Sequence, residues 1–94
     1  GEVLLPEVNW RGSGLGKIAV EAQVNWTFPL RMAEIVWGNG MRTERKIVPV
    51  EGTREFGSSK FAWSADAAGW KWARLAVWDV AGNGAFTQPW VAKP

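Results

Sequence analysis

Apolar and polar residues alternate along much of this chain, and the alternation predicts β-strands rather than helices. Between Lys17 and Phe28 the apolar residues fall at every second position; they are Ile18, Val20, Ala22, Val24, Trp26 and Phe28. Successive side chains of a strand point to opposite faces of a sheet, so this period of two predicts a half-buried strand over 17–28. Pro29 ends it, because proline cannot donate to a strand ladder.

Several further segments have the same character and are separated by turn residues. A strand over 31–37 runs into Gly-Asn-Gly at 38–40, where the glycines favour the positive φ angles of a tight type I′ hairpin. A strand over 41–50 returns from that hairpin. The remaining strands are expected over 2–10, 60–65, 70–80 and 85–92, with turns at 66–69 and 81–84.

Prolines and charges mark two of these strands as sheet edges. Pro6 interrupts a short first strand, and the strand over 41–50 has a polar first half and Pro49 near its end. The glycine-rich segment 11–16 is interpreted as a connector and not as a phosphate-binding loop, since a strand follows it where such a loop requires a helix.

About seven short strands in a chain of 94 residues predict an all-β fold, an immunoglobulin-like antiparallel β-sandwich formed by one domain over 1–94. A small barrel is the alternative, because the number of strands does not distinguish open sheets from closed ones. We interpret the chain as a domain excised from the C-terminus of a larger protein. The missing part of that protein would then set its compartment, with the periplasm and secretion both possible.

The composition argues against catalysis. The chain has no cysteine and no histidine, and its two aspartates and seven glutamates are scattered. It therefore lacks the commonest nucleophile, general base and metal ligands, and we expect no catalytic residue, no bound metal and no cofactor. Asp79 and Asn83 lie in a predicted turn with too few carboxylates for a calcium loop, so Asp79 is expected to accept hydrogen bonds from the amides of its own turn.

The charge and the hydropathy exclude two classes of partner. A net charge of +2, spread along the chain, lacks the basic cluster of a nucleic-acid-binding protein. No apolar run is long enough to span a bilayer, and the chain does not begin with a signal-peptide pattern, so no membrane partner is expected.

Tryptophan is the unusual feature of the composition. The chain has eight tryptophans and four phenylalanines, more aromatic surface than a sandwich of this size can enclose. Trp26 and Trp63 are in phase with apolar positions and are assigned to the core. Along 70–80 one face carries Ala73, Leu75 and Val77 and is assigned to the core, while Trp72, Arg74, Ala76 and Trp78 face outward. The candidate interface residues are Trp37, Trp70, Trp72, Arg74, Trp78 and Trp90.

Exposed indoles serve two common purposes. At protein interfaces tryptophan and arginine are the enriched anchors, and Arg74 can stack on an indole or pair with a carboxylate. In carbohydrate-binding modules aromatic platforms lie beside amides or carboxylates that bind hydroxyl groups, and few amides lie near 72–78. We therefore expect docking on the catalytic domain of a parent chain or self-association, with carbohydrate as the alternative.

Three segments support this expectation: FPLRMAEIVWGNG, GTREFGSSKF and WKWARLAVWDVAGNGAFTQPW. Together they resemble the C-terminal all-β domain of bacterial metallohydrolases of the CehA/McbA type, in the polymerase and histidinol phosphatase (PHP) superfamily, over about residues 17–91. The positions that match are Trp72, Arg74, Asp79, Gly82, Pro89 and Trp90. The resemblance implies a non-catalytic accessory domain of a metal-dependent hydrolase, whose metals are held by a separate N-terminal domain.

Overall fold

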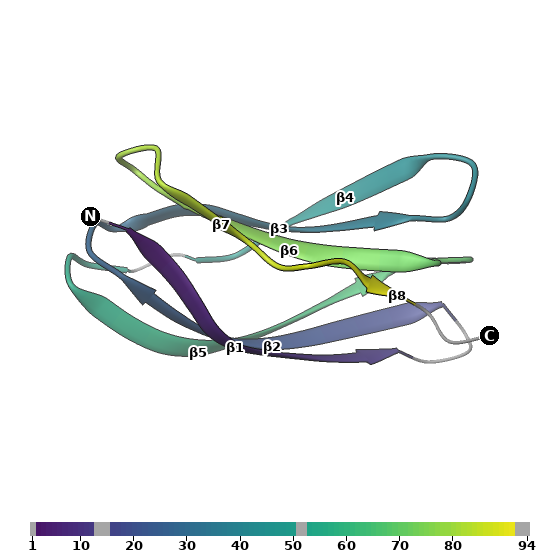
Figure 1. Cartoon of the computed structure of the whole chain (residues 1–94), viewed down its shortest axis with the longest axis horizontal. Coiled ribbons are helices and arrows are strands. Elements are labelled where there is room, and N and C mark those ends of the chain that lie inside the picture. Colours follow the sequence, from purple (N-terminus) through teal and green to yellow (C-terminus); the bar gives the residue numbers. More distant parts are fainter. Residues whose placement is uncertain (1, 13–15, 51–52, 92–94) are drawn as a thin grey trace.

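Two antiparallel sheets packed face to face form the molecule (Figure 1). The computed structural model describes residues 2–12, 16–50 and 53–91. Sheet A has the order β1 (Val3–Gly12), β2 (Lys17–Trp26), β5 (Gly57–Asp66). Sheet B contains β4 (Thr43–Val48), β3 (Leu30–Gly38) and β6 (Trp72–Asp79) in that order, and the short β7 (Gly84–Phe86) and β8 (Trp90–Val91) both pair with β6.

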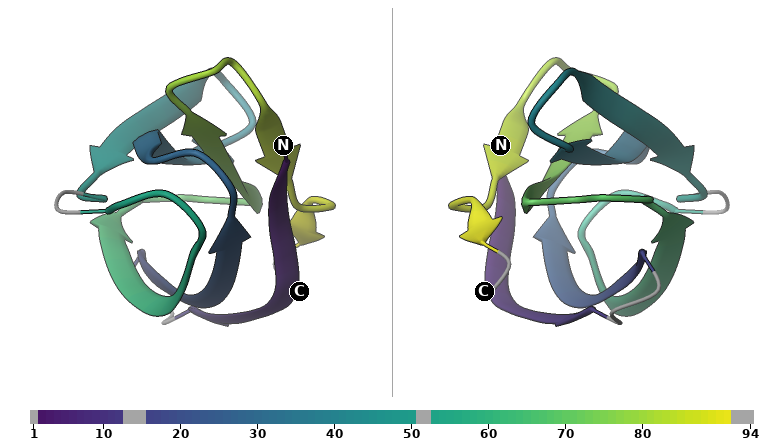
Figure 2. Two further views of the ribbon diagram at one scale, coloured as in Figure 1. Left: turned by 90° about the vertical axis from the view of Figure 1, so that its left-hand side faces the viewer. Right: turned by 90° about the vertical axis from the view of Figure 1, so that its right-hand side faces the viewer.

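This arrangement is the predicted immunoglobulin-like β-sandwich. The chain crosses between the sheets from β2 to β3, from β4 to β5 and from β5 to β6, and makes hairpins from β1 to β2, from β3 to β4 and from β6 to β7. Viewed along the long axis, sheet A curves beneath sheet B and the two layers enclose the core (Figure 2). Two separate sheets rule out the barrel alternative.

The core forms where the alternating faces of β2 and β6 meet. The even-numbered apolar residues of β2 from Ile18 to Trp26 are all buried, and Ala73, Leu75 and Val77 of β6 are each 0% exposed. The assignment of these three residues of β6 to the core is therefore confirmed, whereas Ala76, which was expected to face outward, is also buried, at 1% exposed. The predicted strand over 17–28 ends earlier, at Trp26, and Phe28 lies after it with its side chain 38% exposed.

The edge strands are β1 and β5 in sheet A, and β4 on one side and the short β7 and β8 on the other side of sheet B. The first strand is an edge strand as predicted, but it is ten residues long, and its register shifts between Leu4 and Glu7, around Pro6. The shift lets the strand continue past a residue that cannot donate a hydrogen bond. On the opposite side, Lys46 of β4 donates to the carbonyl of Ser64 on β5 at 2.8 Å and ties the two sheets together.

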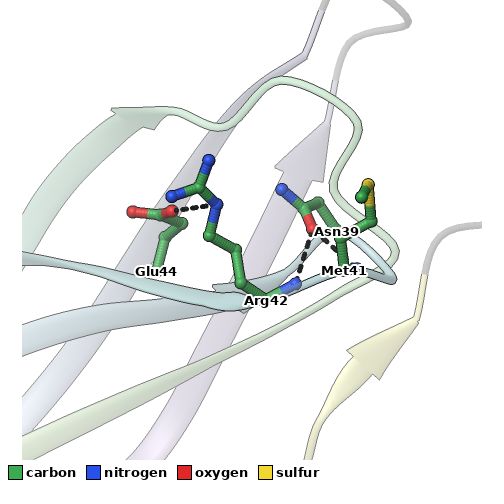
Figure 3. Close-up of polar contacts among 4 residues, drawn as sticks. All are labelled: Asn39, Met41, Arg42 and Glu44. Carbon is green, nitrogen blue, oxygen red and sulfur yellow. Dashed lines mark hydrogen bonds and ion pairs between the residues drawn. The ribbon is translucent and has the colours of Figure 1, made fainter.

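The turn between β3 and β4 differs from the predicted type I′ hairpin. Such a turn needs positive φ at both central residues, and Gly40 alone has it here, with φ of 90°. Asn39 closes the turn instead: its Oδ1 accepts hydrogen bonds from the amides of Met41 at 2.9 Å and Arg42 at 3.0 Å (Figure 3). An ion pair of 3.2 Å between Arg42 and Glu44 flanks this turn.

The last predicted strand, over 85–92, is divided into β7 and β8. Between them Thr87 exchanges two hydrogen bonds with Leu75 of β6, one through its amide and one through its hydroxyl. Pro89 follows, and β8 then resumes the pairing with β6. Ala92 and the central residues of the predicted connector, 13–15, lie outside the described residues.

Candidate interaction face

The six predicted interface residues fall in three different places. Trp37 is wrong as a surface residue: it is 8% exposed and belongs to the core cluster. It lies opposite Ala73 and in the same phase along β3 as Ala33 and Ile35, which are both buried. The surplus of tryptophan suggested its exposure, whereas the period of two along β3 would have assigned it to the core.

Trp70 and Trp90 lie in a column of three stacked indoles with Trp10. The ring of Trp90 is the middle one, with centroid distances of 5.4 Å to Trp10 and 4.6 Å to Trp70. All three pack against the core cluster. Because Trp10 belongs to β1 and Trp90 to β8, the column closes the edge between the two sheets. Sequence reasoning missed Trp10, although it is in phase with Val8 on the inner face of β1.

The other three predicted residues share one surface, the outer face of sheet B. Register places Trp72 opposite Gly38, Arg74 opposite Val36, and Trp78 opposite Met32 and Gly84. Ala76 lies between Glu34 on β3 and Phe86 on β7. We define the outer face as Met32, Glu34, Val36, Arg45, Ile47, Trp72, Arg74, Ala76, Trp78, Phe86 and Val91.

The two indoles of the outer face lie over glycines of neighbouring strands. A Cβ atom at Gly38 would overlap the ring of Trp72, and one at Gly84 would approach Trp78 Cδ1 to 2.7 Å. Phe86 meets Trp78 edge to face at 5.4 Å. Each indole therefore covers a glycine that provides no side chain of its own. Both indoles are half-buried, and the exposed apolar side chains of this face are Val91, Phe86 and Ile47, which are 64%, 60% and 55% exposed.

Charges on the outer face are arranged unevenly. Arg74 is exposed, and its guanidinium lies 6.0 Å from the ring centroid of Trp72. Among the described residues no carboxylate forms an ion pair with it. Glu34, by contrast, is 7% exposed, and its Oε2 is 3.6 Å from Arg45 Nη1 and accepts no hydrogen bond. The exposed charges of this face are therefore positive.

The other sheet presents a different surface. Asn9, Glu21, Gln23 and Asn25 face outward from sheet A, opposite the direction of the core residues of β2. The Gln23 and Asn25 side chains are joined to each other and to Ser58 by hydrogen bonds of 2.7 to 3.2 Å. The amides that could bind hydroxyl groups thus lie on the side of the sandwich opposite Trp72 and Trp78.

Asp79 holds the turn that follows β6, as predicted. It is 0% exposed. Its Oδ1 accepts hydrogen bonds of 2.9 Å from the amides of Ala81 and Asn83, and its Oδ2 accepts one of 2.8 Å from the Asn83 side chain. Burial alone would raise the pKa of Asp79, but these hydrogen bonds, first the one from the Asn83 side chain, outweigh burial and lower it. Its oxygens are occupied by the turn.

Comparisons with protein-family models, curated proteins and solved structures find no match to the chain. Within the described ranges, no group of three or more histidine, cysteine, aspartate or glutamate residues is placed to hold a metal ion. The same part of the chain contains no helix of the length and apolarity needed to cross a membrane. The features that remain to be explained are the aromatic surface and the uncompensated arginine of the outer face.

Proposed function

We propose that this chain is a non-catalytic accessory domain that docks on another protein through the outer face of sheet B. One observation carries the proposal: Trp72 and Trp78 lie on that face on either side of Arg74, with exposed apolar side chains on the adjacent strands. Large contiguous apolar surfaces are rare on proteins that have no partner, and tryptophan and arginine dominate the binding energy of protein interfaces.

The distribution of polar groups favours a protein partner over a sugar. A sugar site needs hydrogen-bonding groups beside its aromatic platform, because the hydroxyl groups of the ligand lose water on binding. None of the residues that define the outer face is asparagine or glutamine, and its carboxylate, Glu34, is buried; the exposed Gln88 lies in the segment between β7 and β8. The amides of Asn9, Gln23 and Asn25 are on the far side of the sandwich. Carbohydrate binding remains the alternative function.

For the identity of the partner we propose the catalytic domain of a metal-dependent hydrolase of the PHP superfamily. The support is the resemblance of the segments around Trp72, Arg74 and Asp79 to the C-terminal domain of the CehA/McbA enzymes. Calorimetric titration of this chain with a purified catalytic domain of that family tests the pairing directly. Binding that is weakened by Trp72→Ala supports it, and absence of binding by the folded wild-type chain contradicts it.

A random peptide library displayed on phage tests the docking function without a known partner. The wild-type chain, the double variant Trp72→Ala/Trp78→Ala and the control Met41→Ala/Phe56→Ala are used as targets in parallel. The control removes two apolar side chains that are 94% and 79% exposed and lie in loops outside the outer face. We expect peptides enriched on the wild type and the control, with enrichment on the double variant reduced at least about tenfold, the scale of a lost hot spot.

Folding and sugar binding are measured on the same proteins. The double variant should keep the circular dichroism of the wild type, because Ala73, Leu75 and Val77 of the same strand form its core. If it unfolds, the two indoles are structural and the docking proposal is lost. Titration with mixed oligosaccharides, followed by tryptophan fluorescence, tests the alternative: a saturable shift that the double variant abolishes would replace docking by carbohydrate binding.

A further inference from the structure

We infer that the surface recognised by the outer face carries an acidic side chain flanked by apolar ones, and that it is not a second copy of this chain. This inference rests on the proposed docking function. It names the chemistry of the partner, and it separates the two partners that the sequence left open, another domain and another copy.

The first argument comes from Arg74. Its guanidinium is exposed, lies 6.0 Å from the ring of Trp72 and has no carboxylate partner among the described residues. A partner that covers Trp72 and Trp78 must also cover Arg74, which lies between them along β6. Removing a guanidinium from water is costly unless acceptors on the partner replace the water, and a carboxylate is the strongest match to its planar fork of donors. We therefore expect the covering surface to present a carboxylate at Arg74.

The second argument concerns Glu34, the acidic residue of this face. It is 7% exposed and already lies 3.6 Å from Arg45. Its position between Ala76 and Ile47 leaves little of the carboxylate accessible to a protein that docks from outside. Arg45, whose side chain is 70% exposed, and Arg74 are the charges that a partner meets.

These charges argue against a second copy. A symmetric dimer formed through the outer face would bring the same patch together with itself. Its accessible charges would be arginines on both sides, without an accessible carboxylate to pair with them. Juxtaposed like charges destabilise an interface. Repulsion between the Arg45 and Arg74 side chains of two copies thus opposes the self-association that the apolar side chains of this face would favour.

Register also predicts the pattern around the acid. Along β6 the positions two residues before and after Arg74 are Trp72 and Ala76, and Phe86 lies beside Ala76. Alternate residues of an extended segment are spaced by about 7 Å, the same spacing as on the strand below. If an extended segment of the partner lies along β6 with its carboxylate over Arg74, the residues two positions before and after that carboxylate lie over Trp72 and beside Phe86. We expect these two residues of the partner to be apolar.

The display experiment described above tests the inference through the composition of the selected peptides. We expect aspartate or glutamate to be enriched, with apolar residues two positions away. Against the Arg74→Glu variant, the same library should yield lysine or arginine at that place. A synthetic peptide from the wild-type selection should bind Arg74→Ala at least about tenfold more weakly, and Arg74→Lys should retain part of the affinity as a point charge without the fork.

Failure of the inference is distinguishable from failure of the docking function. Peptides whose enrichment depends on Trp72 and Trp78 but shows no acidic bias would overturn the inference and leave docking intact. Enrichment that does not depend on these tryptophans would overturn docking and the inference together. If Arg74→Glu loses its fold by circular dichroism, the inference is tested by the affinities of Arg74→Ala and Arg74→Lys for the synthetic peptide. Equal affinities of these two variants and the wild type would overturn it.

Analytical ultracentrifugation tests the exclusion of a second copy. We expect the wild-type chain to sediment as a monomer at concentrations up to about 0.1 mM, a range in which weak self-association is detectable. A dimer that persists in Met41→Ala/Phe56→Ala and disappears in Trp72→Ala/Trp78→Ala would show self-association through the outer face. That result would overturn this part of the inference.

Discussion

At the scale of single residues, Asp79 shows how one side chain organises a turn. Its carboxylate receives two backbone amides and one side-chain amide within the segment 79–83. Gly82, with φ of 87°, supplies the left-handed conformation that the turn needs. The motif that could be mistaken for a calcium loop is thereby explained as the start of the β6–β7 hairpin.

The lowered pKa of Asp79 predicts a loss of stability in acid. A carboxyl group whose folded-state pKa lies below its unfolded-state value near 3.8 stabilises the fold fully above that value. The contribution is lost as the pH falls through 3.8 toward the folded-state pKa. Asp79→Asn should therefore lower the urea midpoint at neutral pH and flatten its dependence on pH below about 4, where that titration falls. Asp66→Asn changes an exposed aspartate and is the control. Equal urea midpoints of the two variants across the pH range would contradict the prediction.

Glycine and tryptophan form cross-strand pairs at three places, Gly38 with Trp72, Gly57 with Trp26 and Gly84 with Trp78. In each pair the indole occupies the space that a Cβ atom would need. The Gly57–Trp26 pair faces the core, whereas the other two pairs lie on the outer face. Trp26 is 9% exposed, and its Nε1 donates a hydrogen bond to the carbonyl of Arg54. Trp26 therefore cannot move aside, whereas Trp72 can lift toward the solvent.

This difference predicts unequal costs for the same substitution. Gly57→Ala should lower the free energy of unfolding by about 1–3 kcal/mol, as overpacking does in a close-packed core, and Gly38→Ala by less. In a Trp72→Ala background Gly38→Ala should cost almost nothing, because the overlapping ring is gone. Urea denaturation of the wild type, the three single variants and the double variant measures these costs. A larger cost for Gly38→Ala than for Gly57→Ala would show that the indoles are not what constrains these glycines.

At the scale of elements, the tryptophan column explains how β8, a strand of two residues, is held in place. It makes two residue pairs with β6, at Trp72 and Ala73. Pairing of this length is weak by itself. Stacking of Trp90 between Trp10 and Trp70 adds contacts to β1 and to the segment before β6. Gly12 contributes by leaving space, since its Cβ atom would lie 2.6 Å from Trp70.

Removing the middle ring should therefore cost more than removing an outer one. Trp90→Ala loses two stacked contacts and buried area, for which we expect about 2–4 kcal/mol of unfolding free energy. Trp70→Ala loses one stack and should cost about half as much. Urea denaturation with near-ultraviolet circular dichroism measures both effects. Equal costs for the two variants would mean that the column does not act as a stack.

At the scale of the whole molecule, the two outer faces have different chemistry. Sheet A faces outward with amides, Arg11 and the Lys60–Glu21 ion pair, while sheet B faces outward with two half-buried indoles and Arg74. A sandwich whose outer faces had no partner would be polar on both. The proposed docking function and the inferred acidic partner both follow from this asymmetry, which no single strand displays.

Alternation along the chain predicts most of the strands and the phase of β2 and β6. Alternation is a property of neighbouring residues, so it identified Ala73, Leu75 and Val77 as core and Trp72, Arg74 and Trp78 as outward without knowledge of the fold. It also located Trp26 and Trp63 in the core. Two aromatic residues are exceptions: Trp37 is buried, as its phase along β3 indicates and contrary to the surplus of tryptophan, and Phe28 lies beyond the end of β2 and is exposed.

Contacts between residues that are far apart in the sequence become visible in the tertiary structure alone. Sheet order brings Trp10 and Trp90 together from opposite ends of the chain and places Gly38 beneath Trp72. It also buries Glu34 against Arg45, so that within the described part of the outer face Arg74 has no ion-pair partner. These outcomes depend on strand register and on the packing of two sheets, and long-range pairing of this kind leaves no periodic signal in a single sequence.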